Sequence, residues 1–425
     1  MSKSDYKLGL FDVVILVISL VIGMGIFRTP AEVAKRSGDE TLFYLAWIAG
    51  GVFAICGALT FAEVGRRMPV TGAYYRVFAQ AYHPVIAFAV NVIILASNAA
   101  SAAGVAMIGA DSLAVWIPQV DKLVSATMMI MVLFALNLLG LQISTIAQYV
   151  FIGIKVLLLL CIISAIVTVE PVSSQLASVT SDHKSVWEAF GMALIPVLFA
   201  YGGYQSTINF GGEIRNSERM MPIGIMIGIG VVTAIYLLAS TAYVHAIGFD
   251  KLAQSKQIAS LVVERIFGET GLHIVTTGLV ISVFAYINVA MLSNPRVIDA
   301  MSADGVFPGR LRTRSTSSNV QVGSLVFFTL ASVVCVFVGK SFEKILNYVI
   351  FIDAIGLAFG AAAMYRLPGN TITLRNHIAA AVFIGSCLFV STNLVLFDTS
   401  AALTGSIFFA GIILIGLLIN YAKRR

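Results

Sequence analysis

The sequence predicts an all-α membrane protein with twelve transmembrane helices, ten of which form two inverted repeats of five. Three observations carry this prediction. The 425-residue chain is 59% hydrophobic and 11% charged, whereas soluble proteins carry about 25% charged residues. Twelve apolar runs each approach the roughly 20 residues that cross a bilayer. Glycines interrupt the first and the sixth of these runs, at matching places in the two halves of the chain.

The apolar runs follow one another along the chain with short polar loops between them. Their expected ranges are 10–34, 41–64, 84–110, 123–141, 146–169, 187–211, 222–247, 272–301, 321–338, 343–365, 376–396 and 402–421. The first run is long and no small-residue cleavage site follows it, so we expect it to remain as a membrane helix. Residues 1–425 are expected to form one transmembrane domain.

The runs divide into two repeats of five and a final pair. Repeat one covers about 10–169, repeat two covers about 187–365, and two peripheral helices cover about 376–421. Because five is odd, the second repeat must cross the membrane in the opposite orientation. Both interrupted runs are then the first helix of a repeat. Gly224 and Gly228, four residues apart in the seventh run, favour close helix packing.

Basic residues predict the orientation. With the N-terminus inside, most Lys and Arg fall in inner loops, including Arg66, Arg67 and Arg296, and the C-terminal Lys-Arg-Arg agrees. Cytoplasmic loops of membrane proteins carry such an excess. We therefore expect a multi-pass protein of the cell membrane with both termini in the cytoplasm. The net charge of +6 is explained by this bias, so nucleic-acid binding is not implied.

Cysteine and histidine usage argues against disulfides, metals and cofactors. The cysteines are scattered through apolar runs, and no histidine pair has ligand spacing. The four cysteines are Cys56, Cys161, Cys335 and Cys387.

The first interruption reads Val21-Ile22-Gly23-Met24-Gly25-Ile26-Phe27. An unpaired backbone group in hydrocarbon costs several kcal/mol, so a broken helix persists only where protein or a watery cavity satisfies it. The break frees donors at the start of the outer half-helix and acceptors at the end of the inner half. These suit the carboxylate and the ammonium of an amino acid. Close helix packing is the alternative explanation.

The second interruption lies in Phe199-Ala200-Tyr201-Gly202-Gly203-Tyr204. Matching breaks in two halves point to the substrate site of a secondary transporter. This segment resembles helix 6 of the amino acid–polyamine–organocation (APC) superfamily, and within it the L-type amino acid transporter branch. The family pattern is Phe-Ala-Tyr-Gly-Gly-Trp, so Tyr204 stands where the family has Trp. The family's continuation is matched by Asn209, Glu213, Arg219 and Pro222.

Three further stretches resemble the same family in order and spacing. Gly23-Met24-Gly25-Ile26-Phe27 is similar to its Gly-Ser-Gly-Ile-Phe. Phe61-Ala62-Glu63-Val64-Gly65 is similar to its signature between helices 2 and 3, and Asp304-Gly305-Val306-Phe307-Pro308 to the end of helix 8. The resemblance implies a LeuT-type fold in which a bundle rocks against a scaffold around a central substrate.

The resemblance also implies the site residues. Main-chain N–H groups from Gly23 to Ile26 would bind the substrate carboxylate. Carbonyls near Val21 and Ile22, and that of Phe199, would accept from its ammonium, while the Phe199 ring closes above as a gate. Asn209 would line the pocket or position the unwound backbone. The implied substrate-binding set is Val21, Ile22, Gly23, Met24, Gly25, Ile26, Phe199, Ala200, Gly202, Gly203 and Asn209.

Lys155 lies midway along the fifth run, where a lysine is costly and is a functional candidate by default. Snorkelling to an interface is the alternative, but apolar residues flank it on both sides. Family members that work without sodium often carry a lysine here, in place of the second sodium ion. We therefore expect no sodium coupling, and proton coupling through Lys155 stays open.

Asp353 in the tenth run has three open interpretations. It could pair with Arg28 in an outer gate, bind a proton, or attract a cationic side chain on the substrate. A water-exposed acid without function is the plain alternative. Ser97, Asn98 and Ser101 in the third run either face the substrate or bridge helices, and we favour the bridge.

The expected function is secondary active transport of an amino acid by alternating access, without sodium, as an exchanger or a proton-coupled carrier. A polyamine or organic-cation carrier of the same fold is the alternative. An enzyme would need clustered acid, base or metal ligands, and a channel would need a filter or a charge ring. Neither pattern occurs. The expected partners are the amino acid, the lipid bilayer and, for the coupled form, protons. The sequence neither requires a partner subunit nor offers an outer-loop cysteine to link one.

Overall fold

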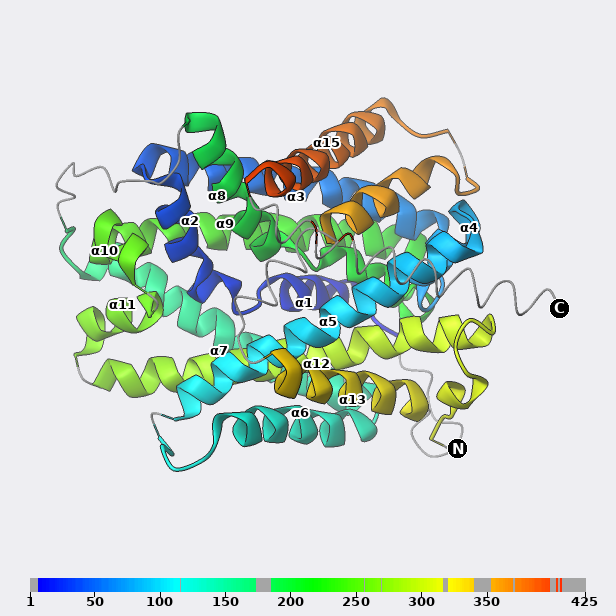
Figure 1. The fold of residues 1–425 in the computed structure, drawn as a ribbon, viewed down its shortest axis with the longest axis horizontal. Helices are drawn as coiled ribbons and strands as arrows, with labels where there is room; N and C mark the ends of the chain where they lie inside the picture. The colour runs from blue at the N-terminus through cyan, green and yellow to red at the C-terminus, as the bar shows by residue number, and fades with distance from the viewer. Residues whose placement is uncertain are drawn as a thin grey trace.

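The computed structural model describes residues 7–114, 116–172, 185–255, 257–268, 270–315, 320–339, 353–369 and 371–397, together with Leu403 and Ser406. These residues form a helical bundle in which α1 lies near the centre (Figure 1). The α-helices labelled in Figure 1 are α1 (Leu10–Val21), α2 (Thr29–Ser37), α3 (Glu40–Arg67), α4 (Ala73–Ala81), α5 (Pro84–Leu113), α6 (Lys122–Leu138), α7 (Leu141–Thr168), α8 (Val186–Tyr201), α9 (Ser217–Ile247), α10 (Phe249–Gln254), α11 (Ile258–Phe267), α12 (Thr270–Ala303), α13 (Val322–Gly339) and α15 (Leu374–Phe397). The short 3-10 helices are η1 (Gly25–Phe27), η2 (Tyr204–Asn209), η3 (Gly211–Glu213), η4 (Gly309–Arg312) and η5 (Ala363–Tyr365).

Helices occupy the first eleven predicted runs. Seven of the described helices are long and apolar enough to cross a membrane, and four shorter apolar helices fall on the remaining runs. One of these four is the helix Asp353–Tyr365. Apart from Leu403 and Ser406, the twelfth run lies outside the described residues, as do positions 343–352 of the tenth. The division into two inverted repeats stays a prediction.

Capping side chains fix where several helices begin. The Asp39 carboxylate accepts from the N–H of Leu42 at 2.9 Å, and the Asp121 carboxylate accepts from Leu123 at 2.9 Å. The Ser185 hydroxyl accepts from Glu188 at 3.2 Å. Each cap satisfies a backbone donor that has no partner inside the helix. The starts of α3, α6 and α8 are thereby set by sequence.

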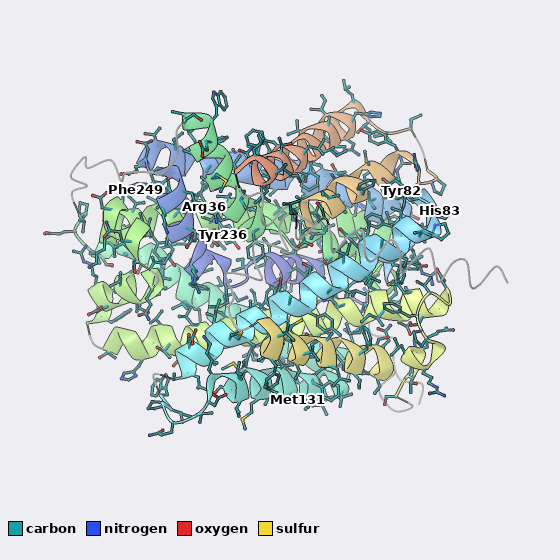
Figure 2. All side chains as sticks on the ribbon, viewed as in Figure 1. Arg36, Tyr82, His83, Met131, Tyr236 and Phe249 are labelled. Carbon is teal, nitrogen blue, oxygen red and sulfur yellow. The ribbon has the colours of Figure 1, made fainter. Side chains whose placement is uncertain are left out.

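The bundle has two distinct ends and an apolar outer surface. The short helix α11 (Ile258–Phe267) lies with α10 at one end, while α4 lies at the other (Figure 1). Apolar side chains project outward between the ends, such as the half-exposed Met131 of α6 (Figure 2). This is the surface that a bilayer would cover.

Close packing joins α1 to α9. A Cβ added at Gly224 would come 2.5 Å from a methyl carbon of Val13, and one at Gly228 would come 2.5 Å from a methyl carbon of Val17. The predicted packing role of this glycine pair is therefore confirmed. Both valines belong to α1, the N-terminal half of the first broken helix, so α9 packs directly against that half.

An amide network joins α6, α7 and α12. Asn137 donates to the side-chain oxygen of Asn288 at 2.8 Å, and Asn288 donates to that of Gln148 at 2.6 Å. Gln148 in turn donates to the Ala285 carbonyl at 3.0 Å. All three amides are buried. A satisfied network of this kind specifies one arrangement of the three helices.

The helix of the eleventh run packs closely on the bundle. α15 packs against α3 and α8, and its place outside the two repeats stays a prediction. Its residues Phe383, Cys387 and Val390 line the central cavity described below. The Phe383 ring lies 6.1 Å from the Phe61 ring of α3, edge to face. Apolar composition alone does not distinguish a helix that faces only lipid from one that also faces a cavity.

Candidate functional site

The first broken helix opens at the expected place. α1 ends at Val21, Gly25–Phe27 forms a 3-10 turn, and α2 begins at Thr29. Within the described residues, no acceptor is found for the backbone N–H groups of Met24, Gly25 and Ile26. Three backbone donors are therefore left at the start of the second half of this helix, where the helix dipole also favours an anion.

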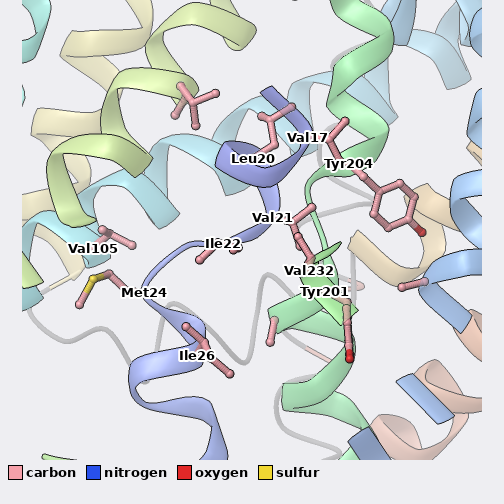
Figure 3. Close-up of a cluster of buried hydrophobic side chains, with 14 of the residues drawn as sticks. Val17, Leu20, Val21, Ile22, Met24, Ile26, Val105, Tyr201, Tyr204 and Val232 are labelled. Carbon is pink, nitrogen blue, oxygen red and sulfur yellow. The ribbon is translucent and has the colours of Figure 1, made fainter. Parts of the chain in front are cut away.

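The second broken helix lies beside the first (Figure 3). α8 ends at Tyr201, and after Gly202 and Gly203 the chain continues as 3-10 helices to Glu213. The sixth apolar run was expected to extend to residue 211, and the change from α-helix to 3-10 helix within it was not predicted. Gly203 has a φ of 117°, and a Cβ there would lie 2.2 Å from the Leu20 carbonyl oxygen. Glycine at this position lets the two breaks touch.

A cavity of about 160 Å³ lies between the breaks. Both breaks contribute to its wall, together with α3, α5, α12, α15 and the helix Asp353–Tyr365. Of the predicted substrate-binding residues, those that line it are Val21, Gly23, Met24, Gly25, Phe199, Ala200, Gly202 and Gly203. Ile22, Ile26 and Asn209 are buried beside it and are not among the described lining residues.

Asn209 braces the unwound segment. Its side-chain oxygen accepts from the N–H of Tyr74 at 2.9 Å, and its amide donates to the Ser293 hydroxyl at 3.2 Å. Its carbonyl accepts from Gly72 at 2.9 Å. Of the two roles implied for Asn209, these contacts favour positioning of the backbone.

Lys155 reaches the first break. Its side chain is fully buried, and its ammonium donates to the Ile22 carbonyl just after α1 ends. A cation at the end of a helix is favoured by the helix dipole. The lysine therefore connects α7 to the point where α1 unwinds, as a snorkelling lysine would not.

Tyr236 of α9 joins the two breaks, and nothing in the sequence pointed to it. Its hydroxyl lies 3.1 Å from the Val21 carbonyl oxygen and 3.0 Å from that of Ala200. The side chain is fully buried between the rings of Trp47 and Tyr201. One hydroxyl proton serves one acceptor at a time, so the two carbonyls share it. A tyrosine in an apolar run looks like an ordinary core residue.

Of the expected gate residues, Phe199 and Asp353 line the same cavity, and Arg28 is not among its described lining residues. Both carboxylate oxygens of Asp353 lie 3.1 Å from the Ser97 hydroxyl, and no ion pair between Asp353 and Arg28 occurs in the described part of the chain. The Arg28–Asp353 gate pair stays a prediction.

A polar wall on α5 and α12 faces the breaks. Asn98 donates to the side-chain oxygen of Asn294 at 2.7 Å. Asn98, Ser101, Tyr286 and Asn294 all line the cavity. Ser97 and Asn98 bridge α5 to neighbouring helices, as predicted. Asn98 and Ser101 also line the cavity.

An ion pair closes the end of the bundle that carries α4. Arg296 of α12 donates two hydrogen bonds to Glu213 of η3, both at 2.7 Å, and its guanidinium lies 4.4 Å from the centre of the Phe210 ring. Leu8 pairs with the same segment, because its N–H donates to the Glu213 carbonyl at 2.8 Å. Such two-pronged charge-assisted contacts are strong.

Comparison with known proteins identifies the family of this chain. A family model described as amino acid permease matches residues 8–425. The chain belongs to this family. The permease is therefore a multi-pass membrane transport protein and not an enzyme, and the resemblance to the APC superfamily is confirmed.

Named relatives of the permease are amino acid transporters. It is 28% identical over 309 residues to the serine/threonine exchanger SteT of Bacillus subtilis (strain 168), which covers 70% of this chain and 68% of the relative. It is 24% identical over 405 residues to the human cystine/glutamate transporter, which covers 90% and 79%. It is 25% identical over 363 residues to the human large neutral amino acids transporter small subunit 2, which covers 82% and 67%.

Proposed function

We propose that this permease is a sodium-independent secondary transporter of amino acids that works by alternating access at the cell membrane. The observation that carries the proposal is the convergence of the two broken helices on one cavity. Three backbone N–H groups, those of Met24, Gly25 and Ile26, would bind the substrate carboxylate. Carbonyls at the ends of α1 and α8 would accept from its ammonium.

Those carbonyls are already engaged by the protein in the present conformation. Lys155 donates to Ile22, and Tyr236 lies against Val21 and Ala200. A carbonyl oxygen has two lone pairs, so each can accept a second bond from the substrate. The two donors would hold the acceptors at fixed positions while the ammonium binds between them.

Sodium independence follows from Lys155. A cation in this place would supply the charge that a metal ion otherwise brings to the end of the first half-helix. Its burial and its contact with Ile22 support this role. The relative SteT is a serine/threonine exchanger, which favours exchange over proton coupling.

Alternating access needs one closure on each side. Glu213 and Arg296 would hold the cytoplasmic side shut in the present conformation, because they join the unwound segment to α12. Phe199 and Arg28 would close the opposite side over a bound substrate. Arg28 and Glu213 each lie on a segment that follows a break, so the unwound backbone would connect each closure to the binding site.

Uptake by the purified full-length chain in liposomes tests the proposal. We expect labelled amino acid to enter sodium-free vesicles that hold unlabelled amino acid, and to enter empty vesicles much more slowly. Entry into empty vesicles driven by a pH gradient would replace exchange by proton coupling. A strict requirement for sodium would refute the role of Lys155. Failure of every amino acid, with polyamines transported instead, would refute the substrate class.

A further inference from the structure

The charge of the cavity wall is unbalanced. Among the described lining residues, Asp353 is the only acid, and no Lys, Arg or His accompanies it. An amino acid that binds through its carboxylate and its ammonium brings no net charge. The wall would therefore keep one uncompensated negative charge when a neutral amino acid is bound.

Asp353 has acceptor capacity to spare. Both of its oxygens lie 3.1 Å from one hydroxyl, that of Ser97, which holds a single proton. A carboxylate offers about four lone-pair sites. Acidic side chains at membrane depth are costly and pair with another group, so a single neutral donor leaves this carboxylate without the partner that its charge calls for.

The charged side chains of the protein do not supply that partner in the described structure. Lys155 donates to the Ile22 carbonyl on the far side of the first break. Across the described residues, no ion pair includes Asp353. A proton, or a cation among the contents of the cavity, must then balance Asp353.

We propose that Asp353 binds a positive charge on the side chain of the substrate, so that the permease prefers cationic amino acids such as lysine or ornithine. The proposal rests on the proposed function and adds the substrate class. The substrate's main-chain groups bind at the breaks, and its side-chain ammonium donates to Asp353. Leu357, one turn further along the same helix, also lines the cavity and packs against the methylene stem, since long cationic side chains bury their stems.

Competition in liposomes tests the preference. Purified full-length protein takes up labelled lysine against internal lysine, and unlabelled lysine, ornithine, leucine and serine compete. We expect lysine and ornithine to compete at concentrations about tenfold or more below leucine and serine, the size of effect that a hydrogen bond to a charged group supports.

Two variants separate recognition from other roles. Asp353→Asn should raise the KM for lysine about tenfold or more and leave the KM for leucine nearly unchanged. Asp353→Glu should keep the preference for lysine over leucine. Asp111→Asn is the matched control, because Asp111 is exposed near the end of α5, pairs with Lys122 at 2.7 Å and is not among the described residues that line the cavity. Thermal unfolding of each purified variant checks that it is folded.

The other outcomes overturn the proposal in distinct ways. If Asp353→Asn raised the KM for lysine and the KM for leucine by the same factor, Asp353 would belong to the gate or have a structural role. Loss of pH-driven accumulation with an unchanged lysine-to-leucine ratio would make it a proton site. Wild-type uptake of neutral amino acids alone would refute the substrate class and leave the proposed function standing. No uptake of any amino acid would refute both.

Discussion

Replacing Gly203 by alanine should damage this protein more than any other single methyl group added at the breaks. Gly203 has a φ of 117°, and a Cβ there would lie 2.2 Å from the Leu20 carbonyl oxygen. The backbone conformation alone costs an L-residue about 1–3 kcal/mol. The contact adds to this, because its partner is main chain at the end of α1 and cannot rotate away.

The expected result is a loss of stability beyond about 3 kcal/mol, together with loss of uptake. Either the η2 segment or the end of α1 must shift, and either shift alters the carbonyls that Tyr236 holds. Gly230→Ala is the matched control, since a Cβ at this α9 glycine meets nothing within 4 Å. It should leave uptake intact and stabilise the helix by about 0.5–1 kcal/mol.

Thermal unfolding of the purified variants and uptake of labelled amino acid in liposomes provide the measurements. If Gly203→Ala matched wild type in both, the close approach of the two breaks would not exist in the functional protein. If it unfolded normally but lost uptake, the strain would be confined to the site.

Three further predictions concern the same region. Gly25→Ala should keep most transport, because its Cβ would lie at an ordinary van der Waals distance of 3.5 Å from Ala200. Gly25→Leu should insert normally into the membrane but show no uptake. If the leucine variant did take up amino acid, the first break would not be part of the substrate site. Tyr236→Phe should weaken substrate binding about tenfold, since two buried carbonyls lose their shared donor; unchanged KM and kcat would make the tyrosine a packing residue. Glu213→Gln should increase labelling of the cavity from the cytoplasmic side, because the bidentate pair with Arg296 loses its charge; equal labelling in wild type and variant would assign closure to other contacts.

Backbone chemistry made the breaks predictable. A glycine pair inside a membrane run has few explanations, and the positive φ of Gly203 is a conformation that glycine adopts readily. The cost of burying an ammonium similarly singled out Lys155, although its contact with Ile22 is seen only in the structure. Such residues break a strong rule for their surroundings, so they stand out in one sequence.

Residues that obey the local rules could not be found this way. Tyr236 sits in an apolar run with the composition of any core helix, and only its distance to two carbonyls reveals a role. The lining of the cavity by α15 depends on how helices distant in sequence pack. The 3-10 turns after Gly203 arise where Gly211 lies against the backbone of Val70, a long-range contact that local propensity does not encode.

The buried amides Asn137, Asn288 and Gln148 give the molecule a stationary frame. Pulling them apart would leave several polar groups unpaired in a medium without water, so α6, α7 and α12 should keep their spacing through the whole transport cycle. Spin labels on these three helices would report constant distances while labels on α1 and α8 move. Lys155 belongs to this frame through α7, so in a transport cycle its contact with Ile22 would be the pivot about which α1 turns.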